Sequence, residues 1–225
     1  MPATLMLICI VLCSALSDPA QARDQPIITN RMTVTSADIY ERIVRPPAPS
    51  HALTLSLAYF GAAGWSAPPI IEYARSAAEI LGQCAVLVSS LELHRIEGGA
   101  HYQYYETRRS RELARRIPLA RPAVYFVADT LQRPAFDAEA VGRANSRTRP
   151  ELADTVWITR EARDPAIVLA HELVHVLMDS GEHVDAPGNL MRDATDAGNV
   201  RLDASQCERL RDTGTRHRLL EPLHP

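Results

Sequence analysis

With 225 residues, the chain is long enough for one full-sized core and does not require a second domain. Its net charge is −3, and its charged residues, 23% of the total, form no long block of one sign. This balance argues against nucleic acid as a partner, because a nucleic-acid-binding surface needs a concentration of Lys and Arg.

The N-terminus contains an uncharged apolar run from Leu5 to Leu16, which is too short to span a bilayer. The small-x-small tripeptide Ala20-Gln21-Ala22 follows it, as at a signal-peptide cleavage site. We interpret residues 1–22 as a signal peptide and expect export, to the periplasm or outside the cell. The run lacks the preceding Lys or Arg that is typical of such signals, and a buried N-terminal helix is the alternative. No other stretch has the length of a membrane span, so we expect none.

Residues 23–51 are polar and end in a proline-rich stretch, from which we expect an N-terminal arm without ordered packing. A single domain is then expected over residues 52–225. Its predicted elements, in chain order, are a strand at Ala52–Phe60, a helix at Pro68–Cys84, strands at Ala85–Arg95, Pro122–Ala128 and Thr155–Thr159, a long helix from Pro165 to a stop at Gly181, and a helix at Ala204–Thr213.

This order of strands and helices predicts an α/β (α+β) layer structure, in which a helix backs a twisted mixed sheet. The stretch Ala140–Asn145 stands between two of the predicted strands. It is either a short edge strand or a solvent loop, and its composition does not separate the two.

Two cysteines, Cys84 and Cys207, would remain after removal of the signal peptide, since Cys9 and Cys13 lie within it. An even pair in an oxidising compartment predicts a disulfide bond. The alternative is two buried free thiols that act as small apolar side chains.

The motif H-E-x-x-H stands at residues 171–175, inside the predicted long helix. His171 and His175 are spaced one helical turn apart on one face, so both imidazoles can bind a single Zn²⁺. Glu172 can then serve as the general base toward a water that zinc activates. The neighbouring positions are apolar, and burying two histidines and a Glu there is costly unless a metal satisfies them. The alternative is two histidines on an amphipathic helix with an exposed Glu between them.

The segment that follows the helix reads GEHVDAPGNLM, from Gly181 to Met191. With this segment, the sequence resembles the metzincin superfamily of zinc peptidases, and the matrixin-like branch most closely. In such enzymes a third His binds the zinc after a bend in the chain, and a Met-containing turn lies beneath the metal. The resemblance implies that His183 is the third ligand and that Met191 is the residue of the Met-turn. It also implies that residues 140–145 pair with an extended peptide.

Two features depart from the metzincin pattern. The interval between His175 and His183 is two residues longer than the familiar H-x-x-G-x-x-H, and Arg192 stands after Met191 where some members place a Tyr near the zinc. Other side chains therefore remain open as the third ligand, because carboxylates also bind zinc. These are Asp179, Glu182 and Asp185, and Glu208 of the last helix.

Taken together, the residues predict an exported zinc-dependent endopeptidase whose substrate is a peptide or protein. A competing hypothesis is a non-hydrolytic, zinc-stabilised domain that binds a peptide or protein on the same scaffold. Glu172 favours the enzyme, because a binding module has no need of a carboxylate at that position.

Overall fold

The computed structural model describes residues 24–131, 140–143 and 148–223. The expected signal peptide lies outside this range. Within it, no helix has both the length and the apolar character that a membrane crossing requires.

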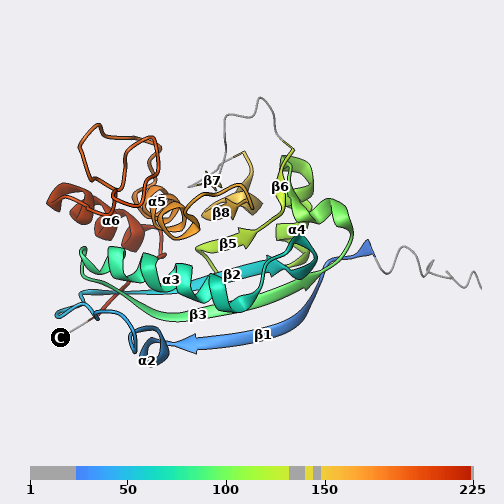
Figure 1. The fold of residues 1–225 in the computed structure, drawn as a ribbon, viewed down its shortest axis with the longest axis horizontal. Helices are drawn as coiled ribbons and strands as arrows, with labels where there is room; N and C mark the ends of the chain where they lie inside the picture. The colour runs from blue at the N-terminus through green and yellow to red at the C-terminus, as the bar shows by residue number, and fades with distance from the viewer. Residues whose placement is uncertain (1–23, 132–139, 144–147, 224–225) are drawn as a thin grey trace, which may run out of the picture.

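The core of the structure is a mixed sheet of seven strands (Figure 1). Its order is β1-β3-β2-β5-β8-β7, and β9 pairs with the start of β2. The central pairs β3–β2, β2–β5 and β5–β8 are parallel, whereas β1, β7 and β9 run antiparallel to their neighbours. The strands are β1 (Ile27–Thr35), β2 (His51–Phe60), β3 (Val86–Glu97), β5 (Ala123–Phe126), β7 (Ala140–Arg143), β8 (Thr155–Ile158) and β9 (Glu221–Pro222).

Helices cover both faces of this sheet, which is why the short strands β5 and β8 are buried on both sides. All four residues of β5 and all four of β8 are buried. On one face pack α3 (Ala67–Gly82) and α5 (Pro165–Met178), with α6 (Ala204–Arg216) beside α5. On the other face α4 (Thr107–Arg116) closes a second apolar cluster around Trp157. The predicted α/β layer architecture with a twisted mixed sheet and backing helices is confirmed.

The remaining elements are short. They are α2 (Ser36–Ile39), the 3-10 turns η1 (Gly61–Ala63), η2 (Ala100–Gln103) and η3 (Pro150–Leu152), and the two-residue strands β4 (Tyr104–Tyr105) and β6 (Asp129–Thr130), which pair with each other. The stretch that the sequence left open between an edge strand and a loop forms β7, the strand beyond β8, over residues 140–143.

The expectation that residues 23–51 lack ordered packing is wrong. Residues 27–35 form β1, which pairs with residues 90–97 of β3, and Ile39 of α2 is completely buried. The sequence signal is weak because Val34 is the one buried side chain of β1. This strand is held by its main-chain ladder to β3, which hydrophobic patterning does not detect.

The long helix also ends earlier than expected. Its last residue is Met178, and Asp179 adopts the left-handed conformation (φ 47°) that Gly181 was expected to supply. An Asp tolerates this conformation better than most residues do. The early end turns the chain at Ser180, which places that residue's carbonyl beside α5.

The structure predicts that β1 stabilises the fold. A chain beginning at Ser36 should be less stable than one beginning at Arg23 by at least about 2 kcal/mol, since several ladder hydrogen bonds are lost. Thermal unfolding should show a midpoint lower by roughly 5 °C or more. Equal midpoints for the two chains would mean that β1 is a dispensable arm after all.

Candidate metal centre

Helix α5 presents His171 and His175 from within the core. Asp164 caps the helix by accepting from the Ile167 N–H, and Pro165 occupies the first helical position. Apolar residues surround most of the helix, so the two histidines are only 4% and 9% exposed. Their spacing of four residues puts them on one face, as the sequence predicted.

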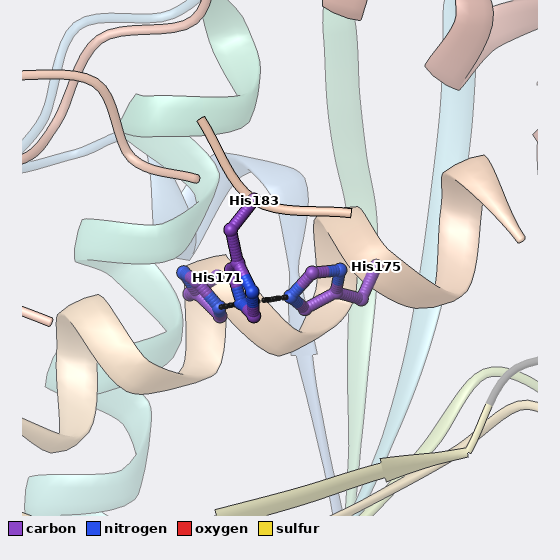
Figure 2. A group of neighbouring side chains, drawn as sticks. All are labelled: His171, His175 and His183. Carbon is purple, nitrogen blue, oxygen red and sulfur yellow. Dashed lines mark hydrogen bonds between the residues drawn. The ribbon is translucent and has the colours of Figure 1, made fainter. Parts of the chain in front are cut away.

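The loop after α5 brings His183 to the same point (Figure 2). The Nε2 atom of His175 lies 2.9 Å from Nε2 of His171 and 3.1 Å from Nε2 of His183, and the third distance is 3.3 Å. Within the described part of the chain, these three residues form the one cluster of His, Cys, Asp and Glu with metal-ligand spacing. His183 is the most exposed of the three, which leaves one side of the cluster open to solvent.

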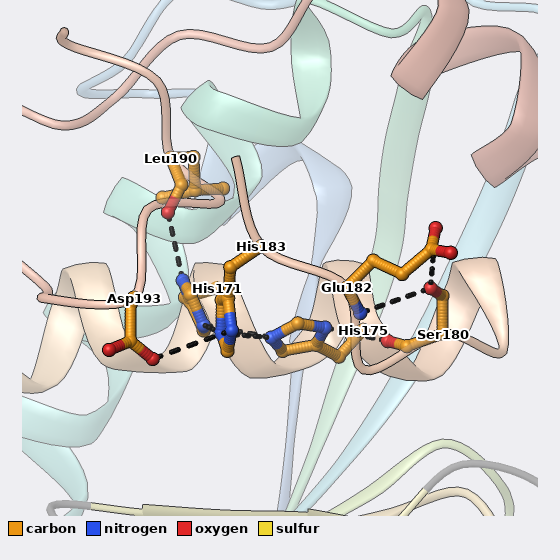
Figure 3. Close-up of polar contacts among 7 residues, drawn as sticks. All are labelled: His171, His175, Ser180, Glu182, His183, Leu190 and Asp193. Carbon is orange, nitrogen blue, oxygen red and sulfur yellow. Dashed lines mark hydrogen bonds and ion pairs between the residues drawn. The ribbon is translucent and has the colours of Figure 1, made fainter. Parts of the chain in front are cut away.

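The hydrogen bonds of the two buried rings define their protonation (Figure 3). Nδ1 of His171 lies 2.8 Å from the Leu190 carbonyl oxygen, and Nδ1 of His175 lies 2.6 Å from that of Ser180. A carbonyl oxygen only accepts, so each Nδ1 carries the proton and donates it. In a neutral ring, Nε2 then has a lone pair and no proton. The short Nε2–Nε2 distances are therefore not hydrogen bonds between these two rings but lone pairs directed at a common point.

Burial keeps these two rings neutral. Desolvation lowers the pKa of His171, and it lowers the pKa of His175 to about 4, with the neighbouring histidines adding to the effect. Neutral imidazole is the form that binds a metal. The donor set fits zinc, because three nitrogens at about 2.0–2.1 Å from a tetrahedral ion stand roughly 3.4 Å apart. The observed separations of 2.9–3.3 Å are close to that value.

The third histidine has a carboxylate partner. Nδ1 of His183 lies 3.5 Å from an oxygen of Asp193, whose own side chain is almost fully exposed (Figure 3). A carboxylate behind a ligating histidine orients the ring and increases its basicity as a ligand. All three rings thus have a partner on the nitrogen that faces away from the common point.

The other candidates for a third ligand lie outside the histidine cluster. Asp179 caps α5, and Glu182 accepts hydrogen bonds from Ser180 and Arg209. Asp185 forms an ion pair with Arg192, and its side chain is 96% exposed. Glu208 lies on the exposed side of α6. None of the four belongs to the described histidine cluster.

The turn containing Met191 contacts both His171 on α5 and the loop that carries His183. The Leu190 carbonyl accepts from His171, and the Met191 carbonyl accepts from the Val184 N–H, next to His183, over 2.8 Å. Met191 itself is completely buried. Sequence reasoning missed the Ser180 and Leu190 carbonyls, since every residue has a carbonyl and no side-chain pattern marks the one that is used.

Glu172 directly follows the first histidine on α5. It is partly buried, between fully buried neighbours on either side. At 3.6 residues per turn, it is displaced by roughly 100° around the helix from His171. The helix thus carries a carboxylate beside the histidine face without adding it to the three-nitrogen cluster.

The two cysteines of the described chain lie next to each other between α3 and α6. The sulfurs of Cys84 and Cys207 are 1.99 Å apart, at disulfide distance, which is the pairing that the sequence predicted. The bond links the residue shortly after α3 to the first turn of α6 across 123 positions of the chain.

The fold is similar to that of a known metalloproteinase, although the sequence matches no known family. No protein-family model and no curated protein matches the sequence. Among solved structures, the chain is similar to the crystal structure of metalloproteinase-II from Bacteroides fragilis, with a TM-score of 0.53 and 16% sequence identity. The similarity covers 77% of this chain, which spans 57% of the length of that one. At this identity the similarity shows a shared fold and nothing further.

The cluster predicts a pH dependence for the metal-free protein. The folded-state pKa of His175 is depressed to about 4 from 6.5, so the unfolded chain binds the proton first as the pH falls. Stability from this group is fully present above pH 6.5 and is lost as the pH falls toward 4. Between pH 7 and pH 4, urea denaturation should show that the wild-type protein loses about 2 to 3 kcal/mol more stability than His175→Gln. Equal losses would contradict the depressed pKa.

The geometry also predicts how metal content depends on single residues. Purified protein should contain about one zinc per chain, and His183→Ala should reduce its zinc affinity strongly, because a ligand is removed from a three-nitrogen site. Asp185→Ala, two residues away and in the same loop, is the matched control and should leave the affinity near that of wild type. Zinc content that was the same in both variants would exclude His183 as a ligand.

Proposed function

We propose that the chain is an exported zinc-dependent endopeptidase, with His171, His175 and His183 as zinc ligands and Glu172 as general base. The observation that carries the proposal is the convergence of three imidazole nitrogens at a helix in which Glu172 directly follows the first of these histidines. The metzincin-like fold supports it, because the fold neighbour named above is a metalloproteinase. We further propose that the matrixin-like segment ending at Met191 is the Met-turn.

The chemistry divides between the ion and the protein. When bound, zinc supplies a Lewis acid that polarises a carbonyl and makes water nucleophilic near neutral pH. The carbonyls of Ser180 and Leu190 hold the two buried rings with Nε2 directed at the common point where the ion would bind, and Asp193 contacts Nδ1 of His183. The Glu172 carboxylate accepts the proton of the attacking water and passes it to the leaving amine.

The sheet offers a place for the substrate. β7 lies beyond β8 and runs antiparallel to it, at one end of the strand order. We propose that an extended peptide pairs with the main chain of β7, which is a common way to bind peptides of varied sequence. This arrangement fits a substrate that is unfolded or has an extended loop.

Export is part of the proposal. A signal peptide over residues 1–22 would be removed, leaving a catalytic domain that includes β1 of the segment at residues 23–51 as well as residues 52–225. The Cys84–Cys207 bond is compatible with this, because disulfides persist in oxidising compartments.

The proposal is tested by Glu172→Gln, which keeps the side chain's size and removes the base. Zinc content should equal that of wild type, whereas cleavage of an unstructured protein substrate should fall by a factor of about 10² to 10⁴. Glu182→Gln serves as the matched control, because it alters a carboxylate of the adjacent loop outside the cluster. It should cleave at close to the wild-type rate.

A different result would favour the competing hypothesis of a non-hydrolytic binding domain. If wild type and Glu172→Gln both held zinc and neither cleaved any member of a broad peptide library, the peptidase proposal would fail. A binding domain would instead retain peptide affinity in both proteins.

A further inference from the structure

A buried pair of amide side chains holds the turn that contains Met191. Asn189 and Gln206 are 7% and 8% exposed. Nδ2 of Asn189 donates to Oε1 of Gln206 over 2.9 Å, and Nε2 of Gln206 donates to Oδ1 of Asn189 over 3.2 Å. Two amides that exchange hydrogen bonds in this way form a closed ring, which fixes the orientation of both groups.

Each of the two amide oxygens accepts a second hydrogen bond. Oδ1 of Asn189 accepts from the Met191 N–H over 2.8 Å, and Oε1 of Gln206 accepts from the Asp203 N–H over 2.9 Å as part of the cap of α6. The pair therefore connects the main chain of the turn to the first turn of α6. Loss of either side chain would leave buried polar groups without a partner, which is costly.

The main chain held in this way is the one that orients the histidines. Fixing the Met191 N–H fixes the adjoining Leu190 carbonyl, which accepts from His171. The Met191 carbonyl holds the Val184 N–H, and Val184 follows His183 directly. The amide pair thus acts on two of the three rings without touching either.

The disulfide anchors this arrangement from two sides, because a glutamine precedes each of its cysteines. Gln206 stands before Cys207, and Gln83 stands before Cys84. Gln83 donates to the Val200 carbonyl over 2.7 Å and accepts from the Leu202 N–H. Between those two residues, Arg201 exchanges main-chain hydrogen bonds with both sides of Asn189: its N–H donates to the Gly188 carbonyl, and its carbonyl accepts from the Leu190 N–H.

We infer that Asn189 and Gln206, anchored through the Cys84–Cys207 bond, are positioning residues that fix His171 and His183 for metal binding. The inference rests on the proposed function, because it takes the histidine cluster as the metal site. It adds that metal affinity depends on a polar contact with the first turn of α6.

The test compares Gln206→Ala and the similarly sized Gln206→Met with wild type. Co²⁺ and Zn²⁺ affinities are measured by competition with a chelator, and the visible spectrum of the Co²⁺ form reports the ligand geometry. Partners of metal ligands typically contribute 10- to 100-fold in affinity, so both variants should bind that much more weakly and show an altered Co²⁺ spectrum. Thr213→Ala, two turns further along the buried side of α6, is the matched control and should bind as wild type does.

A double variant, Asn189→Ala with Gln206→Ala, completes the test. Because both residues act through one pair, the double variant should bind metal about as weakly as either single variant. Metal affinity within twofold of wild type in Gln206→Met, with an unchanged Co²⁺ spectrum, would overturn the inference while leaving the proposed function intact. Wild-type protein that bound no metal would overturn both.

Discussion

The structure depends on one constraint at its histidine cluster. Three imidazole nitrogens face one another at short distance, and neither of the two buried rings has a proton on the nitrogen that faces the other. His171 and His175 each donate their one ring proton to a main-chain carbonyl, so neither Nε2 has a proton to donate to the other. A fold that brought these nitrogens within 3.3 Å of each other for packing alone would lose free energy through repulsion and desolvation. A cation bound at the common point would remove that cost.

The surrounding elements are arranged to hold this geometry. The apolar face of α5 fixes the helix against α3 and the sheet, so that two rings point the same way. Asp179 ends the helix one turn after His175, which turns the Ser180 carbonyl back toward that ring. The turn at Leu190 and Met191 supplies the opposite carbonyl and also restrains the loop of His183. Because the ligands are already held in place, the free energy of metal binding is not reduced by the entropy cost of ordering the loops.

Local patterns predicted the parts of the structure that depend on nearby residues. The placement of His171 and His175 on one face follows from helix geometry alone. The apolar strands were predicted to within a few residues because their runs of apolar residues are also local patterns. β1 was missed because it is stabilised by main-chain pairing with β3, some sixty residues away, and buries one side chain. The Asn189–Gln206 pair was invisible because two ordinary amides became partners only through the fold. The resemblance of residues 181–191 to metzincins supplied His183, which no periodicity could have placed beside the helix.

The central claim is that these three histidines form a single zinc site, and X-ray absorption at the zinc edge tests it most directly. Purified protein with one equivalent of zinc should give three imidazole nitrogens at about 2.0–2.1 Å and one further light ligand. His183→Ala should lose one imidazole from that set. A spectrum with one imidazole or none, or with sulfur at about 2.3 Å, would place the metal elsewhere and contradict the account.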